Sequence, residues 1–145
     1  MGKSVERLME MGIVTEKDLE CATFTWYKED VKDDELALGR CYRELRLVAI
    51  NPLFDNKKFS RKLLDLVVYH EILHLRQNYN KKSGGHDKLF YRWEHEYPYW
   101  YQTHYEYETL TGRTISADVD TSFLDLEFRR SDEMPITETK DKDEY

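Results

Sequence analysis

Residues 67–80 read VVYHEILHLRQNYN and place His70 and His74 four positions apart, with Glu71 directly after the first. A helix turns by about 100° per residue, so positions i and i+4 lie on one face and their imidazole rings can converge on one point. The chain has only five histidines. Two of them at this spacing, on an apolar segment, indicate a site for a single metal ion.

The sequence around this motif predicts a long helix that begins after a cap at Ser60 and runs to about Asn80. An apolar stripe on the side away from the histidines is expected to face the main core. It consists of Leu64, Val68, Ile72, Leu75 and Tyr79. The histidine side is also apolar, through Leu63, Leu66, Val67 and Leu73. A helix that is apolar nearly all round is covered on both sides, so another element should pack over the histidines.

The chemistry of the motif favours zinc. Two buried imidazoles without partners would each cost on the order of 1–3 kcal/mol, a cost that a bound metal ion removes. The letters HEILH match the HExxH pattern, in which two histidines bind zinc and the glutamate takes a proton from the metal-bound water. Zinc lowers the pKa of that water to about 7 and polarises a carbonyl. The alternative is a pair of hydrogen-bonded core histidines with a surface glutamate between them.

A catalytic zinc site takes a third protein ligand and leaves its fourth position open for water. His86 is the first candidate, since it follows His74 by twelve residues across the KKSGG loop, 81–85. The two glycines of this loop suit a tight reversal because glycine adopts positive φ readily. Glu94 on the next predicted helix is the rival ligand, and Glu96 is a weaker candidate.

Shorter elements are expected on both sides of the central helix. A first helix should run from Ser4 to Met11 and stop at Gly12, and a second should begin after Thr15, where Asp18 completes a capping-box pattern. Three segments rich in aromatic and β-branched residues predict strands that pair antiparallel. These segments are TFTWYKE (23–29), LGRCYRE (38–44) and LRLVAIN (45–51).

Two helices should follow the central one, the first beginning near Asp87 and the second lying between Pro98 and Gly112. The order of elements therefore predicts an α+β fold, and the HExxH motif on its central helix makes it resemble a small zincin-like domain. N-terminal helices come first, then a three-stranded, mainly antiparallel sheet packed on the HExxH helix, and finally further helices.

Three segments together resemble the SprT-like zinc metallopeptidases and the similar small bacterial proteins of the YgjP type. The segments are GRCYRELRLVAINPLFD (39–55), LLDLVVYHEILHL (63–75) and GGHDKLFYRW (84–93). The resemblance covers roughly residues 37–93, and the two-part histidine motif is its specific portion. The sequence departs from the family at Asp87, where glycine is common, and no cysteine zinc ribbon follows the domain.

The resemblance implies that His70, His74 and His86 are zinc ligands, that Glu71 is the general base, and that Phe90 packs behind the third ligand. It also implies a cleft in which a peptide lies extended along an edge strand and adds to the sheet through backbone hydrogen bonds. We expect that strand within RELRLVAIN, 43–51.

A side chain that stabilises the oxyanion is a further expectation, since zinc peptidases often use a Tyr or His donor besides the metal. The aromatic run FYRWEHEYPYWYQTHYEY, 90–107, contains four eligible residues, and the sequence does not choose among them. They are Tyr97, Tyr101, His95 and His104.

Composition bounds the remaining possibilities. A chain of 145 residues fits one domain, which we place at 1–135, followed by an acidic tail at 136–145 that is expected to be disordered. With 22 basic and 29 acidic residues, a net charge of −7 predicts weak or no intrinsic nucleic-acid binding. Cys21 and Cys41 have no metal-ligand spacing and are expected to be free thiols. No signal peptide and no apolar run of roughly 18 residues occurs, so no membrane association and a cytoplasmic location are expected.

These observations lead to the hypothesis of a zinc-dependent metallopeptidase with one Zn²⁺ per chain and Glu71 as general base. Its expected substrates are proteins or peptides, with unfolded and DNA-associated proteins as the candidate classes. Two alternatives stay open: a non-catalytic zinc-binding structural or regulatory module, and a nucleic-acid-associated adaptor whose aromatic surface stacks bases.

Overall fold

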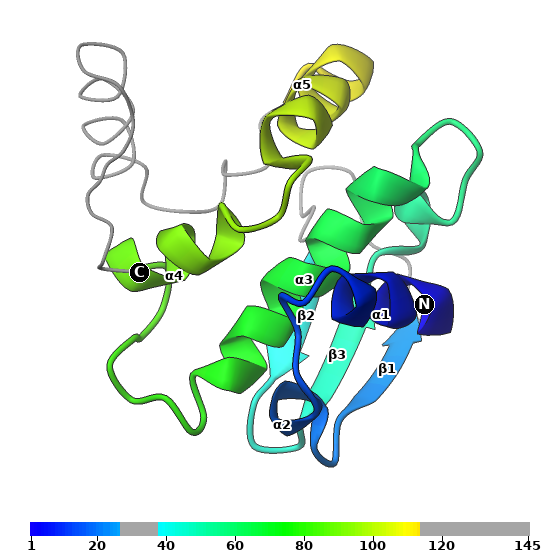
Figure 1. The fold of residues 1–145 in the computed structure, drawn as a ribbon. Coiled ribbons are helices and arrows are strands. Elements are labelled where there is room, and N and C mark those ends of the chain that lie inside the picture. The colour runs from blue at the N-terminus through cyan, green and yellow to red at the C-terminus, as the bar shows by residue number, and fades with distance from the viewer. Residues whose placement is uncertain (27–37, 114–145) are drawn as a thin grey trace, which may run out of the picture.

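The structure is a computed structural model that describes residues 1–26 and 38–113. Helix α3 (Arg61–Arg76) is its centre and contacts most of the other elements. The sheet and α1 (Gly2–Glu10) lie on one side of α3, while α4 (Lys88–Glu94) and α5 (Trp100–Thr111) lie on the other (Figure 1). This arrangement confirms the predicted α+β fold with helices before and after the sheet. The predicted tail, 136–145, lies outside the described residues.

Local capping signals mark the starts of three helices and the end of a fourth, and these four positions agree with the sequence predictions. Thr15 and Asp18 form a full capping box at the start of α2 (Glu16–Leu19). The Ser60 hydroxyl accepts a hydrogen bond from the backbone N–H of Leu63 and so caps α3. The Asp87 carboxylate does the same for α4, and Gly112 closes α5 in the left-handed conformation at φ 73°.

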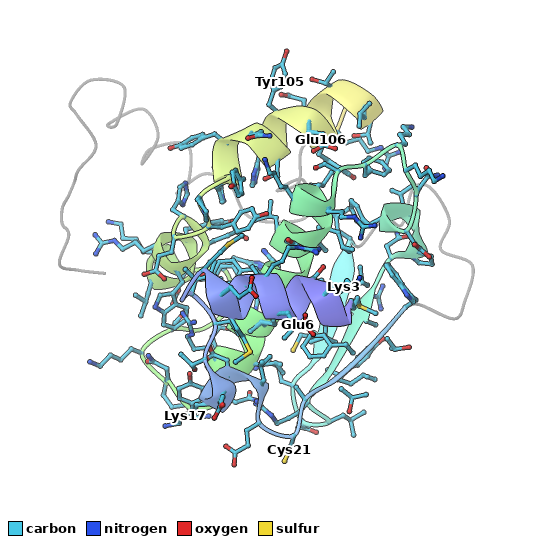
Figure 2. All side chains as sticks on the ribbon, turned by 45° about the vertical axis from the view of Figure 1, so that its right-hand side comes forward. Lys3, Glu6, Lys17, Cys21, Tyr105 and Glu106 are labelled. Carbon is cyan, nitrogen blue, oxygen red and sulfur yellow. The ribbon has the colours of Figure 1, made fainter. Side chains whose placement is uncertain are left out.

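Helix α5 is tied to α3 by a charged side chain. The Glu106 carboxylate accepts hydrogen bonds from the backbone N–H and the hydroxyl of Ser60, at 2.7 and 2.6 Å. Figure 2 shows Glu106 on the inner side of α5 and Tyr105 pointing outward, where it is 72% exposed. A carboxylate at the N-terminus of α3 is favourable because it faces the positive end of the helix dipole.

The sheet contains β1 (Thr23–Trp26), β2 (Gly39–Tyr42) and β3 (Leu47–Ile50) in the spatial order β1-β3-β2. β2 and β3 pair antiparallel, as predicted, and a tight turn joins them. The prediction of antiparallel pairing for β1 is wrong, because β1 pairs with β3 in parallel. The turn forces β2 and β3 to run in opposite directions, but nothing local determines which of them β1 joins.

A second correction concerns the edge of the sheet. The sequence placed the peptide-binding edge strand within 43–51, but β3, which lies there, is the central strand and is paired on both sides. The three buried residues in succession, Val48, Ala49 and Ile50, are typical of a strand covered on both faces. Among the described strands, the edges are β1 and β2.

Helix α3 is covered on both sides, as its sequence predicted. The residues of the histidine side, Leu63, Leu66, Val67 and Leu73, are buried, and so are Val68, Ile72 and Leu75 of the opposite stripe. The helix ends at Arg76, earlier than Asn80, and Tyr79 beyond it is 38% exposed. Within the described ranges, no helix is long and apolar enough to cross a membrane.

A buried ion pair fastens the C-terminal end of α3 to the N-terminal helices. Asp18 is fully buried and accepts two hydrogen bonds from the Arg76 guanidinium, at 2.9 and 3.1 Å, and one from the Tyr79 hydroxyl. Burial alone would raise the pKa of Asp18. The hydrogen bonds from Arg76 and Tyr79 outweigh that effect and hold the pKa below its usual value.

We predict that Asp18→Asn lowers the free energy of unfolding by about 3–5 kcal/mol, because it leaves the Arg76 charge buried without its partner. A carboxyl group whose pKa is lowered by folding contributes its full stabilisation of the folded state at pH values above its unfolded pKa of about 4. It loses this contribution as the pH falls further. Urea unfolding of the parent should therefore show stability decreasing below about pH 4, with a smaller decrease for Asp18→Asn. Exposed Asp55→Asn is the control and should change stability by less than about 0.5 kcal/mol. A variant as stable as the parent at pH 7 would contradict the role of this pair.

Candidate metal centre

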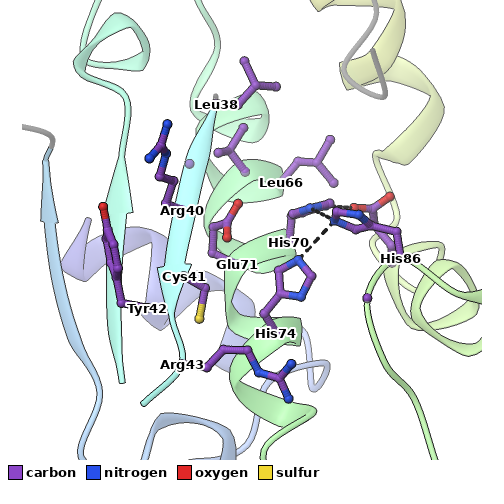
Figure 3. Close-up of a pocket in the computed structure, with 14 residues that line it drawn as sticks. Leu38, Arg40, Cys41, Tyr42, Arg43, Leu66, His70, Glu71, His74 and His86 are labelled. Atoms are coloured by element: carbon purple, nitrogen blue, oxygen red, sulfur yellow. Dashed lines mark hydrogen bonds and ion pairs between the residues drawn. The ribbon is translucent and has the colours of Figure 1, made fainter. Parts of the chain in front are cut away.

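Three imidazole rings converge between α3 and the loop that precedes α4. His70 and His74 project from successive turns of α3, and His86 reaches them from the loop (Figure 3). The Nε2 atom of His86 lies 3.0 Å from Nε2 of His70 and 3.1 Å from Nε2 of His74. One nitrogen from each ring lies within 4.8 Å of the other two, so the group could hold a metal ion.

The outer nitrogen of His70 is held by Glu94. Nδ1 of His70 hydrogen-bonds one carboxylate oxygen, and the other accepts a hydrogen bond from the Trp100 indole N–H at 2.9 Å. Burial would raise the pKa of Glu94, but the charge of His70 and these hydrogen bonds lower it to about 2. An ionised carboxylate only accepts hydrogen bonds, so Nδ1 of His70 carries a proton, and in the neutral ring Nε2 is the nitrogen that presents a lone pair.

The outer nitrogen of His74 is held by Gln77 in the same way. Nδ1 lies 2.9 Å from the Gln77 side-chain oxygen. The Gln77 amide nitrogen already donates to the Ser83 hydroxyl and to the Gly85 carbonyl, at 2.8 and 2.7 Å, which fixes the orientation of the amide. Nδ1 of His74 is therefore also the protonated nitrogen, and its Nε2 presents a second lone pair.

These assignments show that the nitrogen set fits a cation. His86 can place at most one proton on its Nε2, and that proton can serve only one of the two facing lone pairs. Burial, together with the charge of His70, lowers the pKa of His74 to about 3 and that of His86 to about 4, so both rings are neutral at pH 7. Neutral imidazoles are the form that binds zinc. Nitrogens bound to tetrahedral zinc at about 2.0–2.1 Å lie roughly 3.3 Å apart, close to the spacing observed.

Phe90 of α4 lies behind the three rings, at centroid distances of 4.7–5.0 Å. It stacks on His74 and meets the other two edge-on. A rigid aromatic backing of this kind restricts ring rotation and keeps the nitrogens convergent. The packing of Phe90 against His86 agrees with what the family resemblance implied.

Glu71 points from α3 toward β2, on the same side as the converging nitrogens (Figure 3). Its side chain is 5% exposed, and burial raises its pKa to about 7 against the opposing effect of the His70 charge. Gly39 on β2 explains how the Glu71 side chain fits between α3 and the sheet. A Cβ at position 39 would lie 3.0 Å from Cγ and 3.1 Å from Oε2 of Glu71, so the absence of a side chain on β2 makes room for the carboxylate.

The converging nitrogens and Glu71 open into a cavity of about 470 Å³. Residues 38–43, which include β2, form one wall, residues of α3 form another, and His86 and Glu94 also line the cavity. The edge of β2 that pairs with no other described strand therefore lies beside the candidate metal centre. The sequence pointed to β3 for this role, because strand order is not encoded locally.

The two rival ligands lie elsewhere. Glu94 contacts the outer nitrogen of His70, away from the converging Nε2 atoms, and Glu96 is exposed. Sequence reasoning overlooked Gln77, although its position three residues after His74 places it on the same helix face.

None of the four predicted oxyanion donors, all within the described residues, lines the cavity. The Tyr97 hydroxyl donates to the backbone carbonyl of Lys62 at 2.6 Å, and Tyr101 is 57% exposed. His95 and His104 both stack on Trp100, at centroid distances of 4.0 and 3.7 Å. These contacts explain the aromatic run mainly as packing between α4 and α5.

Comparison with known proteins gives no relative: no family model matches the chain, and no curated protein or solved structure is significantly similar to it. The candidate site is therefore defined by its own residues and geometry.

We predict that Glu94→Gln weakens zinc binding about 10- to 100-fold, because it removes the charge that orients and polarises His70. His86→Ala should weaken binding far more, because it removes a candidate ligand. Competition with a chromophoric chelator at pH 7 measures both effects. Exposed Glu96→Gln, two residues away, is the matched control and should bind zinc like the parent. If Glu94→Gln loses zinc as completely as His86→Ala, then Glu94 is itself a ligand.

Proposed function

We propose that the protein is a zinc-dependent metallopeptidase of the SprT-like type, with His70, His74 and His86 as the metal ligands. The observation that carries the proposal is the convergence of three lone-pair nitrogens beside a buried glutamate in one open cavity. Three protein nitrogens leave a fourth position for water or substrate, which is the arrangement of a catalytic zinc site. When bound, zinc would polarise a scissile carbonyl and lower the pKa of the attacking water.

Glu71 is the proposed general base. It follows His70 directly on α3, so its carboxylate faces the cavity without taking part in the nitrogen cluster. It would accept the proton of the attacking water and then carry that proton to the leaving amine. Gly39 leaves room for this carboxylate between α3 and β2, where Glu71 is buried.

The edge of β2 opposite β3, which no other described strand covers, is the proposed binding surface for the substrate backbone. A peptide added there would form main-chain hydrogen bonds that depend little on sequence. Only an extended segment can pair with a strand edge, so unfolded proteins and flexible segments are the expected substrates. For DNA-associated proteins, the protein rather than the DNA would be the bound part, because a net charge of −7 supports only weak binding to DNA.

The proposal is tested by Glu71→Gln, which keeps the shape of the side chain but cannot accept a proton. Cleavage of casein by the zinc-loaded variant should fall roughly 10²- to 10⁴-fold, while zinc content and melting temperature stay close to those of the parent. Glu108→Gln, an exposed position on α5, is the control and should cleave at the parental rate. A Glu71→Gln variant as active as the parent would exclude Glu71 as the base. A parent that binds zinc but cleaves neither unfolded nor DNA-associated proteins would favour the non-catalytic zinc module.

A further inference from the structure

The cavity beside the three histidines has two chemically different ends. Leu38 and Leu66 lie at one end and Arg43 at the other, with Glu71 and the histidines between them (Figure 3). Arg40, the other arginine of the lining, points from β2 away from Glu71. A peptide lying along β2 would pass from an apolar environment to a cationic one across the reacting centre. The two ends can therefore discriminate among substrate side chains.

Arg43 is held in place. Its Nε donates to the side-chain oxygen of Asn78 at 3.0 Å, and the Asn78 amide donates back to the Arg43 carbonyl at 3.1 Å. This reciprocal pair joins the residue after β2 to the second residue after α3. An arginine fixed in this way loses less conformational freedom when a ligand binds than a mobile one does.

The terminal nitrogens of Arg43 are available to a ligand. Within the described ranges, Asn78 is the only side chain that hydrogen-bonds this guanidinium, and it occupies Nε alone. The described arginines that serve the fold differ, because Arg7 and Arg76 are paired with Asp65 and Asp18. A guanidinium presents a planar fork of donors that matches a carboxylate.

We propose that Arg43 recognises a carboxylate of the substrate, so that the site prefers acidic peptides or peptide chain ends. This inference rests on the proposed peptidase function and names its substrate class. The net charge of −7 would repel an acidic peptide at long range, but charges beyond about 8 Å are largely screened at physiological salt. The nearby guanidinium then determines the preference.

Binding of fluorescent peptides to the full-length, zinc-loaded Glu71→Gln protein, which should not turn them over, tests the proposal. One series of amidated hexapeptides carries Glu at each position in turn, and a matched series carries Gln. A third set carries Gln throughout and a free C-terminal carboxylate. We expect at least one carboxylate peptide to bind about three- to tenfold more tightly than its neutral match, with the preference shrinking as salt is raised. Preference for internal Glu indicates a side-chain carboxylate, and preference for the free C-terminus indicates a chain end.

Adding Arg43→Gln to the Glu71→Gln protein should reduce the ratio of the affinities for the acidic and the neutral peptide to about one. Arg43→Lys should keep part of this preference, because lysine keeps the charge but not the planar fork of donors. Arg61→Gln, which makes the same charge change at an exposed position outside the cavity, should keep all of it. Circular dichroism melting checks that each variant is folded. Equal binding of acidic and neutral peptides, or an unchanged preference in Arg43→Gln, would overturn the inference and leave the peptidase proposal standing. Failure of every peptide to bind would overturn both.

Discussion

The convergence of three imidazole nitrogens on one point is the constraint on which the rest of this structure depends. His70 and His74, with their outer nitrogens protonated, turn Nε2 toward Nε2 of His86. When these two rings are neutral, no proton on His86 can satisfy both facing lone pairs. A cation resolves this conflict. The helical spacing of His70 and His74, the loop that brings back His86, and the backing by Phe90 all serve to maintain the convergence.

The convergence of the three nitrogens also depends on hydrogen bonds from residues outside the imidazole rings. Glu94 and Gln77 fix the outer nitrogens, and each is in turn held by a neighbour, Trp100 in one case and Ser83 in the other. These partners come from α5 and from the loop before α4, so the candidate metal centre is tied to the part of the chain that follows α3. Orientation by an outer shell of hydrogen bonds is a general feature of protein metal sites.

Much of this fold follows from short-range signals in the sequence. The caps at Thr15, Ser60 and Asp87, and the stop at Gly112, are set by residues within three positions of each helix end, so they could be predicted. The apolar residues on nearly all faces of α3 likewise predicted that other elements pack against both of its sides. The three histidines could be grouped because helix geometry and loop length limit where they can meet.

Features that depend on long-range packing could not be predicted in the same way. The parallel pairing of β1 with β3 depends on which strand lies in the centre, and the alternation of residues carries no information about strand order. For the same reason the edge beside the site proved to be β2 rather than the strand within 43–51. The role of Glu94 depends on the angle between α3 and α4, which decides whether its carboxylate meets an inner or an outer nitrogen of His70.

The most direct measurement of the central claim is zinc X-ray absorption spectroscopy on the metal-loaded, full-length protein. The account predicts one zinc per chain, surrounded by three imidazole nitrogens at about 2.0–2.1 Å and one exchangeable oxygen. A spectrum with sulfur near 2.3 Å, with fewer than three imidazoles, or with four protein ligands and no exchangeable oxygen would contradict it.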